Sequence, residues 1–246
     1  MSSNKNCIVC GVTLTTTSRR RSHILTKSSY FSKQISKPGE HLMGIKDGAV
    51  ITDDMGHFAW EYLLCDKCEL KVGKWEQERE RLFSSNIRSH NNQKAEPYIE
   101  VTGYNQKYIK LACLADLFRC SEAVGCPYEG IDLGPIHTSI IREILKNENC
   151  NDPNIYPVII ARFNDDYTII DGASNAPLKE RGPDGIRLYE TLVPGGWIWI
   201  IKVDKRDCPI LEKASLGAHK NLLVMNYGNA RKSKELLSIY KSVRGA

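Results

Sequence analysis

The sequence predicts an α+β protein in which a small cysteine-rich module precedes a larger domain of helices and an antiparallel sheet. Two Cys-x-x-Cys pairs bracket the first part of the chain, one at Cys7 and Cys10 and the other at Cys65 and Cys68. Helical periodicity follows the second pair, and β-branched runs become frequent after residue 157. Together these observations give the expected order of module, helices and sheet.

A polar segment without periodicity, residues 84–96, marks the expected domain boundary. A chain of 246 residues holds one or two domains. We therefore expect a metal-binding module over residues 1–83, a linker over 84–96 and an α+β domain of unknown role over 97–246.

Three helices are predicted from apolar residues that recur every three or four positions. The first covers Leu70 to Phe83 and follows the second cysteine pair. The second covers Lys107 to Arg119 and is apolar over most of its surface, so we expect it to be buried. The third begins at Gly134 and Pro135, a favourable first turn. Its expected apolar stripe consists of Ile136, Ile140, Ile141, Ile144 and Leu145.

Strands are predicted in the last third of the chain. Residues 157–163 and 167–170 have the composition of a β-hairpin. Residues 185–193 and 197–203 form two further strands across a Pro-Gly-Gly turn, and the second is apolar on both faces, which is typical of a central strand. A closing helix is expected over 233–243.

The bulk composition places the chain among ordinary globular proteins. No segment approaches the roughly 18 apolar residues that a membrane span needs, and the N-terminus lacks the apolar core of a secretory signal, so we expect a cytoplasmic protein without membrane contact. The net charge of +5 lies before residue 96, where 15 Lys/Arg face 10 Asp/Glu, whereas the rest has 19 of each. This distribution favours an anionic partner for the N-terminal module.

The two cysteine pairs predict one structural zinc ion bound by Cys7, Cys10, Cys65 and Cys68. Each Cys-x-x-Cys turn supplies two thiolates, so two turns complete a tetrahedron and leave no open coordination position for catalysis. The alternatives are unrelated buried cysteines or a redox Cys-x-x-Cys pair.

The sequence between the cysteine pairs contains Ser22-His23-Ile24, and Leu63-Leu64 precedes the second pair. With the four cysteines, these motifs resemble the four-cysteine branch of the HNH or His-Me finger endonucleases, a treble-clef or ββα-metal fold. The resemblance covers Cys7 to about Phe83. Together with Leu114 to Arg119, the pattern is also similar to uncharacterised bacterial HNH-like proteins.

The resemblance implies a divalent-metal-dependent endonuclease in which His23 is the general base and Glu69 helps to hold a catalytic Mg²⁺ or Mn²⁺ ion. The chain departs from the family pattern in two places. Ser22 replaces the acidic residue or histidine that usually precedes the base, and Trp60-Glu61 stands where the central asparagine is expected. A histidine kept for packing in a binding module is the alternative for His23.

Arg19, Arg20 and Arg21 precede this histidine, and guanidinium groups at that place would pair with nucleic-acid phosphates. The sequence thus predicts a nucleic-acid-binding, HNH-like zinc protein. One alternative is a catalytically inactive zinc module that acts as a scaffold for a protein partner, and another is a thiol redox protein. The remaining cysteines and histidines show no ligand spacing: Cys113, Cys120, Cys126, Cys150, Cys208, His41, His57, His90, His137 and His219.

Overall fold

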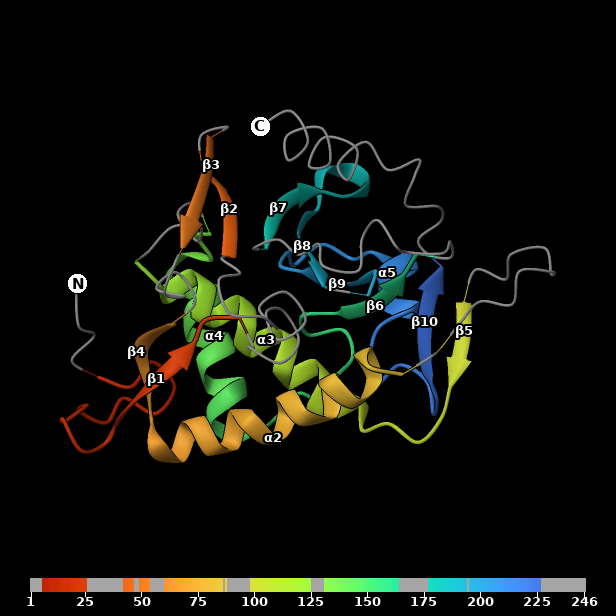
Figure 1. Cartoon of the computed structure of the whole chain (residues 1–246). Coiled ribbons are helices and arrows are strands. Elements are labelled where there is room, and N and C mark those ends of the chain that lie inside the picture. The colour runs from red at the N-terminus through yellow and green to blue at the C-terminus, as the bar shows by residue number, and fades with distance from the viewer. Residues whose placement is uncertain are drawn as a thin grey trace.

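A computed structural model describes residues 6–25, 42–46, 49–53, 60–85, 87, 98–124, 131–163, 177–193 and 195–226. Their elements, in chain order, are β1 (Arg19–His23), β2 (Leu42–Lys46), β3 (Ala49–Asp53), β4 (Trp60–Cys65), α2 (Asp66–Phe83), β5 (Tyr98–Val101), α3 (Gln106–Glu122), α4 (Gly134–Asn147), β6 (Val158–Arg162), β7 (Leu178–Arg181), the 3₁₀ turn η2 (Pro183–Gly185), β8 (Arg187–Val193), β9 (Trp197–Lys202), α5 (Pro209–Lys213) and β10 (Leu222–Asn226). The fold is α+β, with the four cysteines near its N-terminus (Figure 1).

Six strands form the main sheet, in the order β5-β10-β6-β9-β8-β7. All six residues of β9 are buried, which confirms the prediction of a central strand that is apolar on both faces. The predicted antiparallel sheet needs one correction: β10 runs parallel to β6, whereas the other pairs of this sheet are antiparallel. Three strands and α5 separate β6 from β10 in the chain, so no local turn restricts β10 to an antiparallel orientation.

The predicted hairpin of residues 157–163 with residues 167–170 is not the pairing that β6 makes. This strand bonds to β9 on one side and to β10 on the other, so both of its edges have partners from distant sequence. Residues 167–170 lie outside the described part of the chain, as does the closing helix expected over 233–243.

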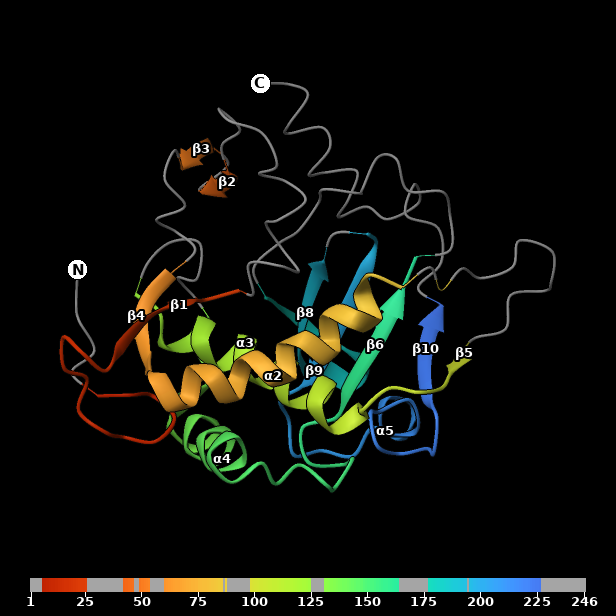
Figure 2. The same cartoon turned by 60° about the horizontal axis from the view of Figure 1, so that its bottom comes forward.

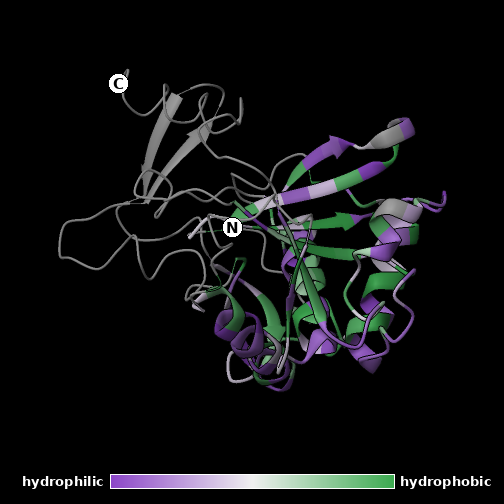
Figure 3. Cartoon of the chain, turned by 90° about the vertical axis from the view of Figure 1, so that its right-hand side faces the viewer, coloured by the Kyte–Doolittle hydropathy of each residue, from purple (hydrophilic) through white to green (hydrophobic). Residues whose placement is uncertain are grey.

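Helices cover one face of the sheet, and a smaller apolar layer covers the other. In Figures 1 and 2, α2 and α3 run side by side across the strands. Alternate residues of β6 and β9 point to opposite faces: Val158, Ile160, Trp197, Trp199 and Ile201 join the helix-side core, whereas Ile159, Ala161, Ile198 and Ile200 join a second cluster with Cys208 and Ala214 beside α5. Figure 3 shows this as hydrophobic strands inside more hydrophilic surfaces.

The three predicted helices are present, but α4 buries only part of its expected stripe. Ile141, Ile144 and Leu145 are buried, while Ile136 and Ile140 are 59% and 40% exposed. The helix therefore packs along one narrow edge of its apolar surface. No helix in the described residues combines the length and the apolar character that crossing a bilayer requires.

One continuous core links the two sides of the predicted boundary at 84–96. Helix α2 lies before that boundary and α3 after it, yet they share the helix-side core. The ring of Phe83, at the end of α2, stacks on Trp197 of β9 with centroids 5.2 Å apart. The division into two domains stays a prediction, and the two parts are joined by packing.

A buried ion network crosses the α2–α3 contact. Arg79 and Asp116 have no exposed side-chain surface and are 2.6 Å apart, and Asp116 also pairs with Arg119, which in turn pairs with Glu76. Removing one member of a buried network leaves charge that water cannot solvate. The network therefore fixes how α2 lies against α3.

We predict that Asp116→Asn lowers the free energy of unfolding by about 3 kcal/mol or more, because the two arginines lose their shared buried carboxylate. Urea unfolding followed by circular dichroism measures this change. Glu143→Gln, which breaks an exposed pair with Lys146, is the control and should cost less than about 0.5 kcal/mol. Equal losses in both variants would show that the buried network contributes little.

Candidate metal centre

The first cysteine pair lies in a tight turn that its glycine allows. The Gly11 N–H donates to the Cys7 carbonyl at 2.8 Å, and the Cys7 N–H donates to the Val12 carbonyl at the same distance. Gly11 has φ +76°, a left-handed conformation that glycine adopts without steric cost. The turn thus brings Cys7 and Cys10 onto one side of a short loop.

The second pair lies at the junction of β4 and α2. Cys65 is the last residue of β4 and the N-cap of α2, and Cys68 follows in the first helical turn. The Asp66 N–H donates to the Ser18 carbonyl at 3.1 Å, which holds the helix start against the residue before β1. Strand, helix and cysteine positions are therefore fixed together.

A bulge in β4 sets the direction of its buried side chains. Arg20 pairs with Leu64 and Ser22 pairs with Glu61, so two residues of β4, Tyr62 and Leu63, face one residue of β1. Leu63 and Leu64 are both fully buried although they are adjacent. Regular alternation would have exposed one of them.

Two backbone contacts hold the first cysteine turn against the rest of the fold. The Ile8 N–H donates to the Leu63 carbonyl at 3.0 Å, and the Arg142 guanidinium of α4 donates through Nε to the Ile8 carbonyl at 2.9 Å. The turn is therefore anchored both to β4 and to a helix from the second half of the chain.

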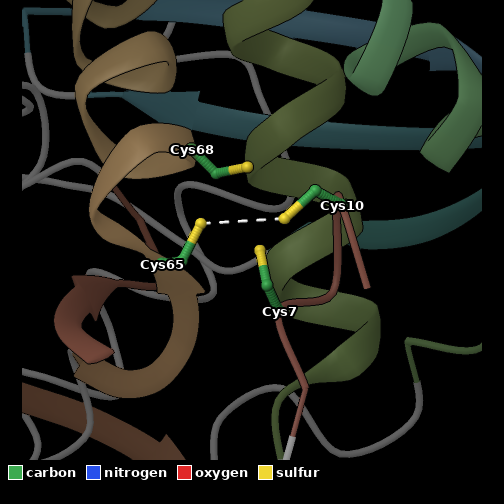
Figure 4. Close-up of side chains that lie close together, drawn as sticks. All are labelled: Cys7, Cys10, Cys65 and Cys68. Atoms are coloured by element: carbon green, nitrogen blue, oxygen red, sulfur yellow. Dashed lines mark hydrogen bonds between the residues drawn. The ribbon is translucent and has the colours of Figure 1, made fainter. Parts of the chain in front are cut away.

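The four sulfur atoms converge, as Figure 4 shows. Each of Cys7, Cys10, Cys65 and Cys68 offers one sulfur, and all four sulfurs lie within 4.8 Å of one another. The Cys10 and Cys65 sulfurs are 3.7 Å apart. A tetrahedral zinc site with Zn–S bonds of about 2.3 Å has sulfur–sulfur edges of about 3.8 Å. The donor set and its spacing fit such an ion, as the sequence predicts.

The thiols also respond to one another electrostatically. A hydrogen bond from the Cys68 thiol, aided by backbone amides such as that of Cys10, lowers the pKa of Cys7 to about 4 despite its burial. The same bond raises the pKa of Cys68, and burial raises it further. A metal cation in the centre would stabilise the thiolate form of all four cysteines.

A disulfide does not account for the cluster. All four cysteines are free thiols, and 3.7 Å is far beyond the roughly 2.05 Å of a disulfide bond. The other described cysteines, Cys113, Cys120, Cys150 and Cys208, are buried. Within the described residues, they join no second group of three or more possible ligands.

The predicted catalytic residues occupy different environments. Ser22 is fully buried, and its hydroxyl donates to Oε2 of Glu69 at 2.8 Å. Burial raises the pKa of Glu69, while Arg119 and this hydrogen bond act in the opposite direction. His23 ends β1 opposite Trp60, and strand alternation turns its side chain to the face away from Ser22. Neither His23 nor Glu69 belongs to a three-ligand group among the described residues.

The three arginines alternate between the two faces of β1: Arg20 lies on the face of Ser22, and Arg19 and Arg21 lie on the face of His23. Arg20 pairs with Asp66 at the start of α2. The Arg19 guanidinium lies over the Tyr62 ring and that of Arg21 over the Trp60 ring, each 4.4 Å from the ring centroid. We call these four residues, Arg19, Arg21, Trp60 and Tyr62, the arginine–aromatic face. A surface hollow of about 630 Å³ lies beside it, bounded by β1 and the first turn of α2.

Trp60 and Tyr62 were not among the predicted site residues. Their alternation ahead of Cys65 is a visible signal, because residues two apart in a strand share a face. The hydrogen bond between Ser22 and Glu69 has no such signal, since 47 positions separate them.

Comparison of the chain with protein-family models, with curated proteins and with solved structures returns no match. The four-cysteine cluster is therefore the part of the predicted resemblance that the structure supports.

We predict that purified protein contains one zinc ion per chain and that Cys68→Ser loses it, because three thiolates hold zinc less tightly than four. Plasma mass spectrometry gives the zinc content, and thermal unfolding should shift downward in the variant. Cys208→Ser, a buried cysteine outside the cluster, should keep one zinc ion. Full zinc content in Cys68→Ser would contradict the four-cysteine site.

Proposed function

We propose that this chain is a zinc-containing nucleic-acid-binding protein whose contact surface is the arginine–aromatic face. The observation that carries the proposal is the repeated stacking of Arg19 on Tyr62 and Arg21 on Trp60 beside the cysteine cluster. Stacking orders each guanidinium while leaving its N–H groups able to bind phosphate oxygens.

The chemistry of this face suits a single-stranded segment. Arginines in a row neutralise successive phosphates, and a base can stack on a guanidinium plane that itself lies over an aromatic ring. Arg21 is exposed, and Arg19, Trp60 and Tyr62 are half-buried, so both groups reach solvent. The surplus of positive charge before residue 96 adds long-range attraction for such a ligand.

The zinc ion has a structural role in this proposal. The order of the first cysteine turn, the β1–β4 pair and α2 supports the proposal of a treble-clef, HNH-like module, in which four thiolates leave no coordination position for a substrate. The metal holds β4 against the start of α2, and it thereby fixes the strand that presents Trp60 and Tyr62.

Hydrolysis by His23 stays a hypothesis. It requires His23 and Glu69 to act on one divalent ion, whereas Glu69 is turned toward Ser22 and His23 toward the opposite face of β1. Binding therefore forms the core of the proposal. Cleavage that needs Mg²⁺ or Mn²⁺ and disappears in His23→Ala would add the endonuclease activity to it.

We predict that Arg19→Gln/Arg21→Gln weakens binding of a fluorescent single-stranded oligonucleotide about tenfold at 0.1 M salt and reduces the magnitude of the slope of log K against log salt by about 1.4. The reason is that each lost arginine removes one phosphate contact. Fluorescence anisotropy measures both the affinity and its salt dependence. DNA and RNA oligonucleotides are compared.

Lys107→Gln/Lys220→Gln is the matched control, since it removes the same charge from two exposed side chains elsewhere. Its affinity should stay within about twofold of wild type. Absence of binding by wild type, or an equal loss in both double variants, would refute the proposal and favour the alternative of a scaffold for a protein partner.

A further inference from the structure

A second cationic surface shares no lining residue with the hollow beside the arginine–aromatic face. It is a hollow of about 450 Å³ at the edge of the main sheet, formed by β7, the 3₁₀ turn η2, the start of β8, the segment after β9 and one residue of α4. We call it the cationic hollow, and its basic side chains are Lys179, Arg181, Arg187, Lys205 and Arg206.

The two carboxylates of the hollow do not neutralise these charges. Asp204 is bound on both oxygens by Arg206, with a closest distance of 2.7 Å, and it also accepts the Arg187 backbone N–H. Arg206 accordingly lowers the pKa of Asp204. Glu180 also lines the hollow, but among the described residues it forms no ion pair, so five basic side chains face two carboxylates.

Four of the five basic side chains of the hollow are outside any ion pair of the described residues. Among the residues that the structure describes, Lys179, Arg181, Arg187 and Lys205 form no ion pair. Arg181 stands directly opposite Arg187 in the β7–β8 pairing. Like charges at opposed strand positions destabilise a sheet, and a bound anion would remove that cost.

The walls of the hollow are held in place without a ligand. Arg206 donates to the backbone carbonyls of Asp184 and Gly185, both at 2.8 Å, and so ties the β7–β8 turn to the segment after β9. Nε of Arg187 donates to the Val203 carbonyl at 2.9 Å, which fixes its guanidinium at the rim. Fixed cationic groups bind an anion at a smaller entropy cost.

His137 reports the electrostatic character of the hollow. Its Nδ1 lies 2.8 Å from the Tyr156 hydroxyl. Burial lowers the pKa of His137, and Arg187 and Lys205 lower it further. Asp204 acts in the opposite direction, so the net effect of the charged groups around His137 is that of the cations.

From this arrangement we infer that the cationic hollow binds a small oligophosphate, such as an inorganic triphosphate or the triphosphate of a nucleotide. Four unpaired cations match the three to four negative charges of such a group better than the charge of one carboxylate. The volume lies in the range of sites for small ligands. The site is independent of the arginine–aromatic face.

The test is isothermal titration calorimetry of the full chain with inorganic tripolyphosphate at constant ionic strength, with zinc content measured before and after. Wild type should bind one tripolyphosphate per chain, and ATP should compete for it. Lys179→Gln/Lys205→Gln should bind about tenfold more weakly, because two charge-assisted contacts are lost from exposed positions where folding does not depend on them.

Two controls keep this result separate from the proposed nucleic-acid surface. Lys107→Gln/Lys220→Gln and Arg19→Gln/Arg21→Gln should both bind tripolyphosphate within about twofold of wild type. Absence of tripolyphosphate binding, or an equal loss in the controls, would overturn the inference. So would a Lys179→Gln/Lys205→Gln variant that loses oligonucleotide affinity but keeps tripolyphosphate affinity, because the hollow would then belong to a nucleic-acid surface.

Discussion

The convergence of four cysteine sulfurs is the constraint on which the N-terminal part of this protein depends. The first cysteine turn is short: Cys7, Ile8 and Val9 are buried in the core, whereas the residues from Cys10 to Thr13 are exposed. Two hydrogen bonds, one from the Ile8 N–H and one from the Arg142 guanidinium, are modest anchors. A zinc ion held by four thiolates contributes folding free energy in addition to this packing. It also links the turn to the junction of β4 and α2, from which the rest of the helical layer extends.

Polar contacts carry this arrangement into the core. Ser22 of β1 holds Glu69 of α2, and Arg119 of α3 lies close enough to Glu69 to lower its pKa. Arg119 then pairs with Asp116, which also binds Arg79. Buried charges, as well as apolar packing, therefore fix the positions of β1, α2 and α3 relative to one another. The arginine–aromatic face lies on the outer side of the same strand pair, so its geometry depends on this support.

The sequence predicts the elements whose signals are local. Paired Cys-x-x-Cys turns reveal the cluster because each pair is four residues long, and the spacing of Val72, Trp75, Arg79 and Leu82 reveals α2, where all four are buried. The sequence does not predict features that depend on distant residues. One is the parallel pairing of β10 with β6, which are some 60 residues apart in the chain. Another is the exposure of Ile136 and Ile140, because nothing in the described fold covers that side of α4. The sequence does not predict the cationic hollow for the same reason, since α4, β7 and the segment after β9 each contribute one or a few of its residues.

The central claim is that Cys7, Cys10, Cys65 and Cys68 together bind one zinc ion, and X-ray absorption at the zinc edge of the purified protein tests it most directly. A structural four-cysteine site predicts a single shell of four sulfur atoms at about 2.3 Å, with no nitrogen or oxygen neighbour. A shell with nitrogen or oxygen ligands, or protein that carries no zinc after purification without chelators, would contradict the account.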